Sequence, residues 1–166
     1  MNRALDDMQH QGGLAELPTR KTLETTLLAG IAVFAISFVG TWYRVWWDSI
    51  IGLLVTAVGY YSIRDVGLVP MGLYFDLGYY GAIFSFLLHG IAFGVIAAEL
   101  STQRIESRLT GTNETPSGLL IFVLVIELIL LGFSGAVMGL FYRLRKEISD
   151  VEVNAAGEGK DYKELV

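Results

Sequence analysis

The sequence predicts an all-α, polytopic membrane protein in which four transmembrane helices form one bundle. The chain has 166 residues, is 53% hydrophobic and has a mean hydropathy of +0.52. An ordinary globular domain contains about 45–50% apolar residues. Charged residues gather at both ends and in short breaks between long apolar stretches. This distribution is typical of helices that face lipid and are joined by short polar loops.

Four stretches are long enough to cross a bilayer. A hydrocarbon core about 30 Å thick requires about 20 helical residues at about 1.5 Å each. The stretches that meet this requirement are residues 23–43, 46–63, 77–100 and 118–142. The second is the shortest, and its inner end lies anywhere between Arg64 and Pro70, because a charged pair at 64 and 65 can reach the interface.

The distribution of positive charge predicts that both ends of the chain are cytoplasmic. Cytoplasmic loops carry an excess of Lys and Arg. Nine of the 12 such residues share a side if the N-terminus is inside, namely Arg3, Arg20, Lys21, Arg64, Arg143, Arg145, Lys146, Lys160 and Lys163. The other three are Arg44, Arg104 and Arg108. Residues 1–22 and 143–166 are therefore expected to be cytoplasmic tails, the second partly disordered from Asn154, in a protein of the cell membrane.

Composition excludes several kinds of site. The chain has no cysteine, which removes disulfides, Cys-ligated zinc and iron–sulfur clusters. A net charge of −5 without a dense Lys/Arg cluster gives no reason to expect a nucleic-acid partner. A haem held by two histidines would need a second subunit, since His89 is the one histidine at membrane depth. Zinc needs three or four ligands, and His89 with Glu127 supplies two, so we expect no metal and no cofactor.

Two ionisable residues lie deep within the apolar stretches. Counted at about 1.5 Å per residue, His89 lies about 16 Å and Glu127 about 14 Å below the outer surface, and Thr56 lies at about 15 Å. A charged carboxylate at this depth costs about 2.5–3.5 kcal/mol, so Glu127 should be buried in the bundle and neutralised by a proton or by histidine. In the functional interpretation Glu127 binds a proton or cation, His89 is its partner or relay, and Thr56 is an accessory ligand. The structural alternative is a Glu–His hydrogen bond that joins two helices.

Small residues recur at four-residue spacing on three of the predicted helices, where they permit close helix contact. The glycines concerned are Gly52, Gly59, Gly90, Gly94, Gly135 and Gly139. They fit packing within the bundle, and they also fit an interface with a second copy or with another membrane protein. The spacing does not separate these two interpretations.

Charged residues at the ends of the second stretch are expected to form solvated rims. Arg64 and Asp65 would lie at the cytoplasmic rim, and Arg44 with Asp48 at the outer rim. Such charges are ordinary features of a membrane boundary.

Three classes of function remain open. The leading prediction is a structural or accessory subunit of a larger membrane assembly, because the loops are short and no catalytic constellation is present. The alternative is a proton- or cation-coupled transporter or channel that uses Glu127 and His89. An intramembrane enzyme is the third, although Ser85 one turn before His89 has no evident orienting acid and the sequence indicates no substrate class. The expected partners are the lipid bilayer and either a membrane protein or further copies of the chain.

Overall fold

Four α-helices make up the computed structural model, which describes residues 17–42, 44–65, 70–110 and 118–164. They are α2 (Pro18–Thr41), α3 (Trp46–Ile63), α4 (Leu73–Thr110) and α5 (Gly118–Glu164). Each described range is helical apart from short ends and turns. The predicted all-α class is therefore confirmed for the described part of the chain.

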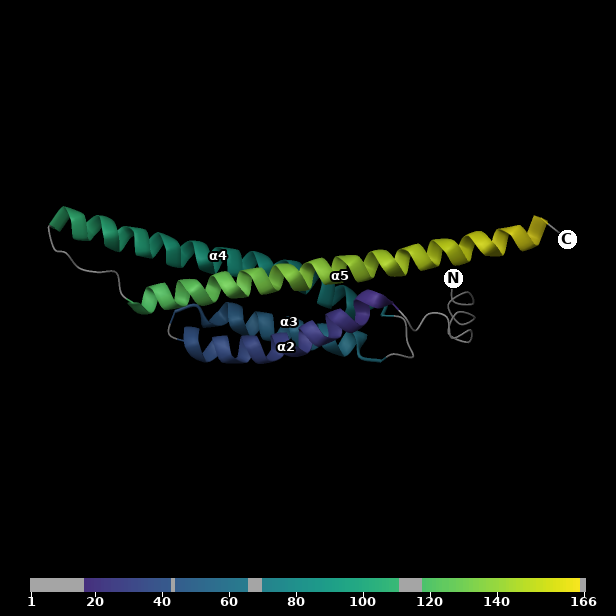
Figure 1. The fold of residues 1–166 in the computed structure, drawn as a ribbon, viewed down its shortest axis with the longest axis horizontal. Helices are drawn as coiled ribbons and strands as arrows, with labels where there is room; N and C mark the ends of the chain where they lie inside the picture. Colours follow the sequence, from purple (N-terminus) through teal and green to yellow (C-terminus); the bar gives the residue numbers. More distant parts are fainter. Residues whose placement is uncertain (1–16, 43, 66–69, 111–117, 165–166) are drawn as a thin grey trace.

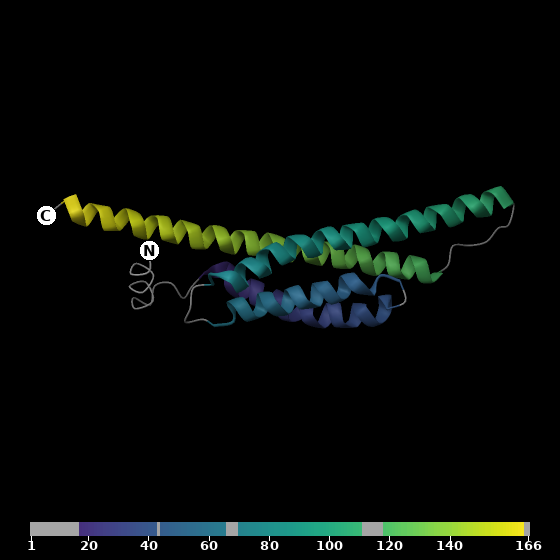
Figure 2. The ribbon, with the colours of Figure 1, turned by 180° about the vertical axis from the view of Figure 1, so that it is seen from behind.

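The helices form a closed ring of neighbours. Each helix packs against the next one along the chain, and α2 also packs against α5. Successive helices run in opposite directions, so that α2 begins and α5 ends towards the same end of the molecule (Figure 1). The same arrangement seen from behind shows α4 and α5 extending well beyond α2 and α3 (Figure 2). Short connections between sequence neighbours favour this antiparallel arrangement.

Three of the four helices are long and apolar enough to cross a membrane. The candidate spans are Pro18–Thr41, Leu73–Ser107 and Gly118–Val151. Large apolar side chains such as Ile36, Val39 and Leu128 lie exposed on the outside of the helices, where lipid rather than water is the compatible solvent. The chain therefore has the features of a multi-pass membrane protein. The remaining helix, α3, has 18 residues and carries Asp48 in its first turn.

Buried residues follow a seven-residue repeat on each helix. Their spacing alternates between three and four positions, as in left-handed helix packing. On α2 they are Arg20, Leu23, Leu27, Gly30, Phe34, Ser37 and Thr41. On α5 they are Leu120, Val123, Glu127, Leu130, Ser134, Val137, Phe141, Leu144 and Ile148. Polar side chains thus occupy core positions of the bundle.

Several helix ends differ from the predicted ones. The third helix begins at Leu73 and not at residue 77, and it continues past residue 100 to Thr110. The fourth continues past residue 142 to Glu164, through the tail predicted to be partly disordered. Hydropathy marks the apolar part of a helix and not its ends, and no proline lies between residues 73 and 110 or between 118 and 164 to stop these helices. The second helix covers Trp46–Ile63, so it stops at the near side of the range that the sequence left open for its inner end.

The first helix starts earlier than predicted and is anchored to its neighbours. It begins at Pro18, whose fixed backbone suits a first helical position. The buried Arg20 side chain donates hydrogen bonds from Nε and Nη2 to the Ile63 carbonyl oxygen at 2.9 and 2.7 Å, and from Nη2 to that of Asp65. These carbonyls lie at the C-terminal end of α3, where a cation is favoured. The Thr19 hydroxyl donates to Glu147 of α5, so Thr19 and Arg20 attach the start of α2 to α5 and α3.

The predicted packing glycines are not equivalent in the structure. A Cβ atom would lie 2.4 Å from Phe34 at Gly52, 2.8 Å from Phe141 at Gly59 and 3.3 Å from Phe86 at Gly135. At Gly90 the nearest atom would be 3.9 Å away, on Leu131, and at Gly94 and Gly139 no atom would lie within 4 Å. The first three glycines therefore lie at helix contacts, because a side chain of another helix occupies the missing Cβ space.

Candidate functional site

Three ionisable side chains from three different helices meet in the core of the bundle. They are Asp48 of α3, His89 of α4 and Glu127 of α5, and they are 1%, 0% and 0% exposed. His89 Nδ1 lies 3.1 Å from Asp48 Oδ2 and 3.4 Å from Glu127 Oε2. The three candidate ligand atoms all lie within 4.8 Å of one another. We call this arrangement the Asp48–His89–Glu127 cluster.

Helical periodicity brings each member of the cluster inward. Asp48 lies four residues before Gly52 and eight before Thr56, both of which are buried on α3. Similarly, His89 lies one turn after the buried Ser85, and Glu127 lies between the buried Val123 and Leu130. Because residues three and four positions apart share one helix face, each ionisable side chain points towards the neighbouring helices.

The fourth helix of the ring covers the cluster with an aromatic side chain. The Phe34 ring of α2 stacks on the His89 imidazole, with centroids 5.4 Å apart and planes inclined by 15°. Phe34 is itself buried and touches Phe133 of α5 edge-on. All four helices therefore contribute to the surroundings of His89, and apolar surface excludes bulk water from the cluster.

The cluster contains more negative than positive charge when both carboxylates are ionised. Within the described part of the chain, His89 is the one basic side chain that pairs with both Asp48 and Glu127, and it is cationic only when it is protonated. A single N–H at Nδ1 can be donated fully to one carboxylate at a time. Glu127 Oε1 and His89 Nε2 have no hydrogen-bond partner among the described residues. Since unpaired buried charge is costly, the cluster requires additional protons or a bound cation.

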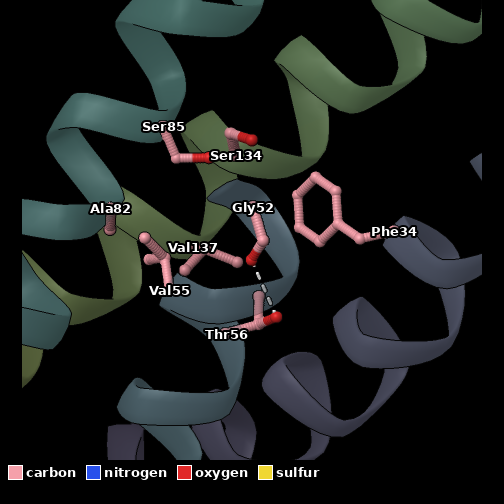
Figure 3. A pocket seen from close by; sticks show the side chains of 8 residues that line it. All are labelled: Phe34, Gly52, Val55, Thr56, Ala82, Ser85, Ser134 and Val137. Atoms are coloured by element: carbon pink, nitrogen blue, oxygen red, sulfur yellow. Dashed lines mark hydrogen bonds between the residues drawn. The ribbon is translucent and has the colours of Figure 1, made fainter. Parts of the chain in front are cut away.

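A small, mainly apolar cavity adjoins the ring of Phe34. It measures about 10 Å³ and is lined by Phe34, Gly52, Val55, Thr56, Ala82, Ser85, Ser134 and Val137 (Figure 3). This volume is close to the smallest that holds one water molecule. The hydroxyls of Ser85 and Ser134 are buried without a partner among the described residues. One water molecule in this cavity would therefore find polar groups one turn from His89.

The structure brings together His89 and Glu127, but it leaves Thr56 out of their cluster. The Thr56 hydroxyl donates to the carbonyl oxygens of Gly52 and Leu53 on its own helix, at 2.9 Å each. Asp48, which contacts His89, lies about 12 Å from Thr56 along α3. The depth estimate for Thr56 was therefore wrong. It assumed that all helices begin at one level, whereas α4 and α5 extend beyond α3.

Asp48 is the member of the cluster that sequence reasoning missed. It was predicted to lie with Arg44 at a solvated outer rim, but it is fully buried, and Arg44 instead pairs with Glu99 at 2.9 Å. The sequence feature that indicates burial of Asp48 is its spacing of four residues from Gly52, which places it on the small-residue face of α3.

The other two predicted rim residues, Arg64 and Asp65, are exposed. Arg64 lies 5.0 Å above the Tyr61 ring.

The cluster contains one more possible metal ligand than the sequence indicates. Asp48 lies within the same small volume as His89 and Glu127, so three ligands are available and not two. Imidazole and carboxylate groups are suitable ligands for divalent cations, and they also exchange protons. Chemically, the site can hold a cation or transfer a proton.

The fold and this site define the class of protein: a helical membrane protein with an ionisable cluster buried in its bundle. Comparison of the chain with protein families, curated proteins and solved structures finds no match.

Proposed function

We propose that the chain crosses the cell membrane four times, with both ends in the cytoplasm. The 18 residues of α3 extend over about 27 Å, close to the thickness of a bilayer core of about 30 Å. This helix packs between α2 and α4, so it shares their environment. The beginning of α2 and the end of α5 lie towards one end of the molecule, as an even number of crossings requires (Figure 1). The excess of Lys and Arg favours the cytoplasm for that end.

The function that the geometry supports best is proton- or cation-coupled transport. The observation that supports this proposal is the Asp48–His89–Glu127 cluster, in which three fully buried ionisable groups lie close together. Ionisable residues inside the membrane are expensive to insert, and they generally mark ion pathways or proton relays. Because His89 Nδ1 is close to both carboxylates, it can link Asp48 to Glu127 during the movement of a proton or a cation.

The size of the cavity favours a transporter over an open channel. Among the described residues, the space beside Phe34 holds about one water molecule, and the surface that lines it is mainly apolar. A water-filled pore would need a continuous wide passage. We therefore infer that transport proceeds through a relay or by movement of the helices around the cluster.

Replacement of Glu127 with glutamine should abolish ion flux in reconstituted vesicles. The change keeps the shape of the side chain but removes its capacity to carry charge or to accept a proton. Proton flux is measured with an enclosed pH-sensitive dye, and metal cation flux with a chelating dye. The matched control is Glu99→Gln, because Glu99 is a partly exposed glutamate paired with Arg44.

Two results would remove the transport proposal. The first is unchanged flux in the Glu127→Gln variant, and the second is the lack of any flux in the unaltered protein. Loss of flux in the Glu99→Gln control as well would show that the effect is not specific to the cluster.

A second candidate function is an accessory subunit of a larger membrane assembly. The lengths of α4 and α5 favour it, since 38 and 47 residues extend over about 57 and about 70 Å. Both helices project beyond α2 and α3 (Figure 1). Near the projecting end of α4, Ile105 and Leu109 are 58% and 81% exposed. Apolar side chains on a projecting helix are suitable contacts for a partner protein.

Native mass spectrometry of the protein extracted gently from its own membrane tests this candidate. The expected result is a stable complex with other membrane proteins at native abundance. A lone chain, or an assembly of identical chains, would contradict the accessory role and leave transport as the proposal.

A further inference from the structure

We infer that the Asp48–His89–Glu127 cluster is a binding site for one divalent transition-metal cation of the zinc class. This inference names the class of cation that the proposed transporter would move. Movement of the ion rests on the proposed transport function, whereas binding of the ion does not. The site would use His89 Nδ1, Asp48 Oδ2 and Glu127 Oε2 as ligands.

The separations between these atoms suit a single metal ion. Zinc lies about 2.0–2.2 Å from histidine nitrogen and carboxylate oxygen, so two ligands of a tetrahedral site are about 3.3–3.5 Å apart. His89 Nδ1 lies 3.1 Å from Asp48 Oδ2 and 3.4 Å from Glu127 Oε2. One carboxylate oxygen of Asp48, one of Glu127 and one ring nitrogen of His89 all lie within 4.8 Å of one another. An ion at this position would therefore require little movement of the three helices.

The charge of the cluster also matches a divalent cation. Two ionised carboxylates with a neutral imidazole carry two negative charges, and one divalent ion balances them. In the described ranges neither carboxylate forms an ion pair with a Lys or Arg side chain. A buried pair of carboxylates without such balance is strongly unfavourable.

An unpartnered carboxylate oxygen in the cluster is a second, independent indication of a ligand. Glu127 Oε1 is fully buried and lacks a hydrogen-bond partner among the described residues. Glu127 Oε1 can accept a hydrogen bond from a water molecule on the metal or can bind the metal itself. Three protein ligands leave a fourth position open, which distinguishes an exchangeable site from a closed structural one. A transported ion needs such a position in order to enter and leave.

The ligand types indicate which cations would bind. Imidazole together with carboxylates suits Zn²⁺, Co²⁺, Fe²⁺ and Mn²⁺. Ca²⁺ and Mg²⁺ require six or more oxygen ligands or several retained waters. The site is therefore expected to reject Mg²⁺ and Ca²⁺ in favour of transition metals.

Binding is tested on the purified full-length chain in detergent, with Co²⁺ as a spectroscopic probe and Zn²⁺ as a competitor. We expect one Co²⁺ per chain, displaced by Zn²⁺ but not by a large excess of Mg²⁺. Asp48→Asn and Glu127→Gln should each weaken binding by more than about 100-fold, because loss of an outer-shell partner alone costs about 10–100-fold. The Glu99→Gln control should bind like the unaltered protein. Size-exclusion elution and helical circular dichroism show which variants remain folded.

The outcomes separate the metal site from the transport function. The metal site is overturned if the unaltered chain does not bind Co²⁺, or if the folded Asp48→Asn and Glu127→Gln variants both bind it normally. This conclusion does not depend on the ion flux measured in vesicles. A proton flux that depends on Glu127 without Co²⁺ binding would keep the transport function and remove the metal site. Binding without movement of any cation in vesicles would support the metal site and remove the transport function.

Discussion

Replacement of His89 with leucine should lower the free energy of unfolding by about 3–5 kcal/mol, the usual cost of breaking a buried ion pair by removing one partner. The variant would leave Asp48 and Glu127 in the core without their shared cationic partner. Leucine fills a similar volume, so lost packing against Phe34 contributes little to the effect. The measurement is equilibrium unfolding in mixed detergent micelles, followed by circular dichroism.

A triple variant provides the matched control for this effect. His89→Leu combined with Asp48→Asn and Glu127→Gln removes the unbalanced charge together with the histidine. It should recover part of the lost stability, since burying an unpaired neutral amide costs far less than burying an unpaired carboxylate. Equal destabilisation by the single and triple variants would show that histidine acts through packing and not through charge.

Replacement of Gly52 with alanine should destabilise the bundle by about 1–3 kcal/mol, the usual cost of adding an atom to a filled core. The new Cβ atom would lie 2.4–2.7 Å from three atoms of the Phe34 ring. Phe34 is fully buried, and it stacks on His89 and contacts Phe133. The cavity beside the ring is only about 10 Å³, so displacement of the ring should also disturb its neighbours, including the Asp48–His89–Glu127 cluster.

Gly94→Ala is the matched control because it makes the same chemical change in a helix. No atom lies within 4 Å of a Cβ at Gly94. Both variants gain the helix propensity of alanine over glycine, about 1 kcal/mol, so their difference isolates the contact with Phe34. Unfolding of both variants is measured under identical conditions. Equal stability of the two would show that α2 and α3 are not in close contact at this position.

The sequence predicted the existence of the helices better than their ends. The start of α3 at Trp46 agrees with the predicted stretch, whereas α2 begins before residue 23 and α4 and α5 continue past residues 100 and 142. An apolar stretch reports burial in lipid, and a helix can continue into polar surroundings without any change in backbone hydrogen bonding. Arg20 illustrates the limit, because its role depends on the carbonyl of Ile63 in another helix.

Part of the candidate site was also accessible from the sequence. His89 and Glu127 stand out because ionisable residues are rare within long apolar stretches. Asp48 does not stand out, since it lies near the end of its stretch, where charges are ordinary. Its place in the core follows from the position of α3 between α2 and α4.

By itself, the sequence determined the helical membrane class, the approximate position of each helix and two of the three ionisable residues in the core. It did so because insertion into lipid requires long apolar helices and makes each intramembrane charge conspicuous. Only the tertiary structure decided the order of helices in the ring, the inward face of each helix and the meeting of Asp48 with His89 and Glu127. The physical reason is that lipid-facing and core-facing residues are both apolar in a membrane bundle, so hydropathy does not identify the inner face.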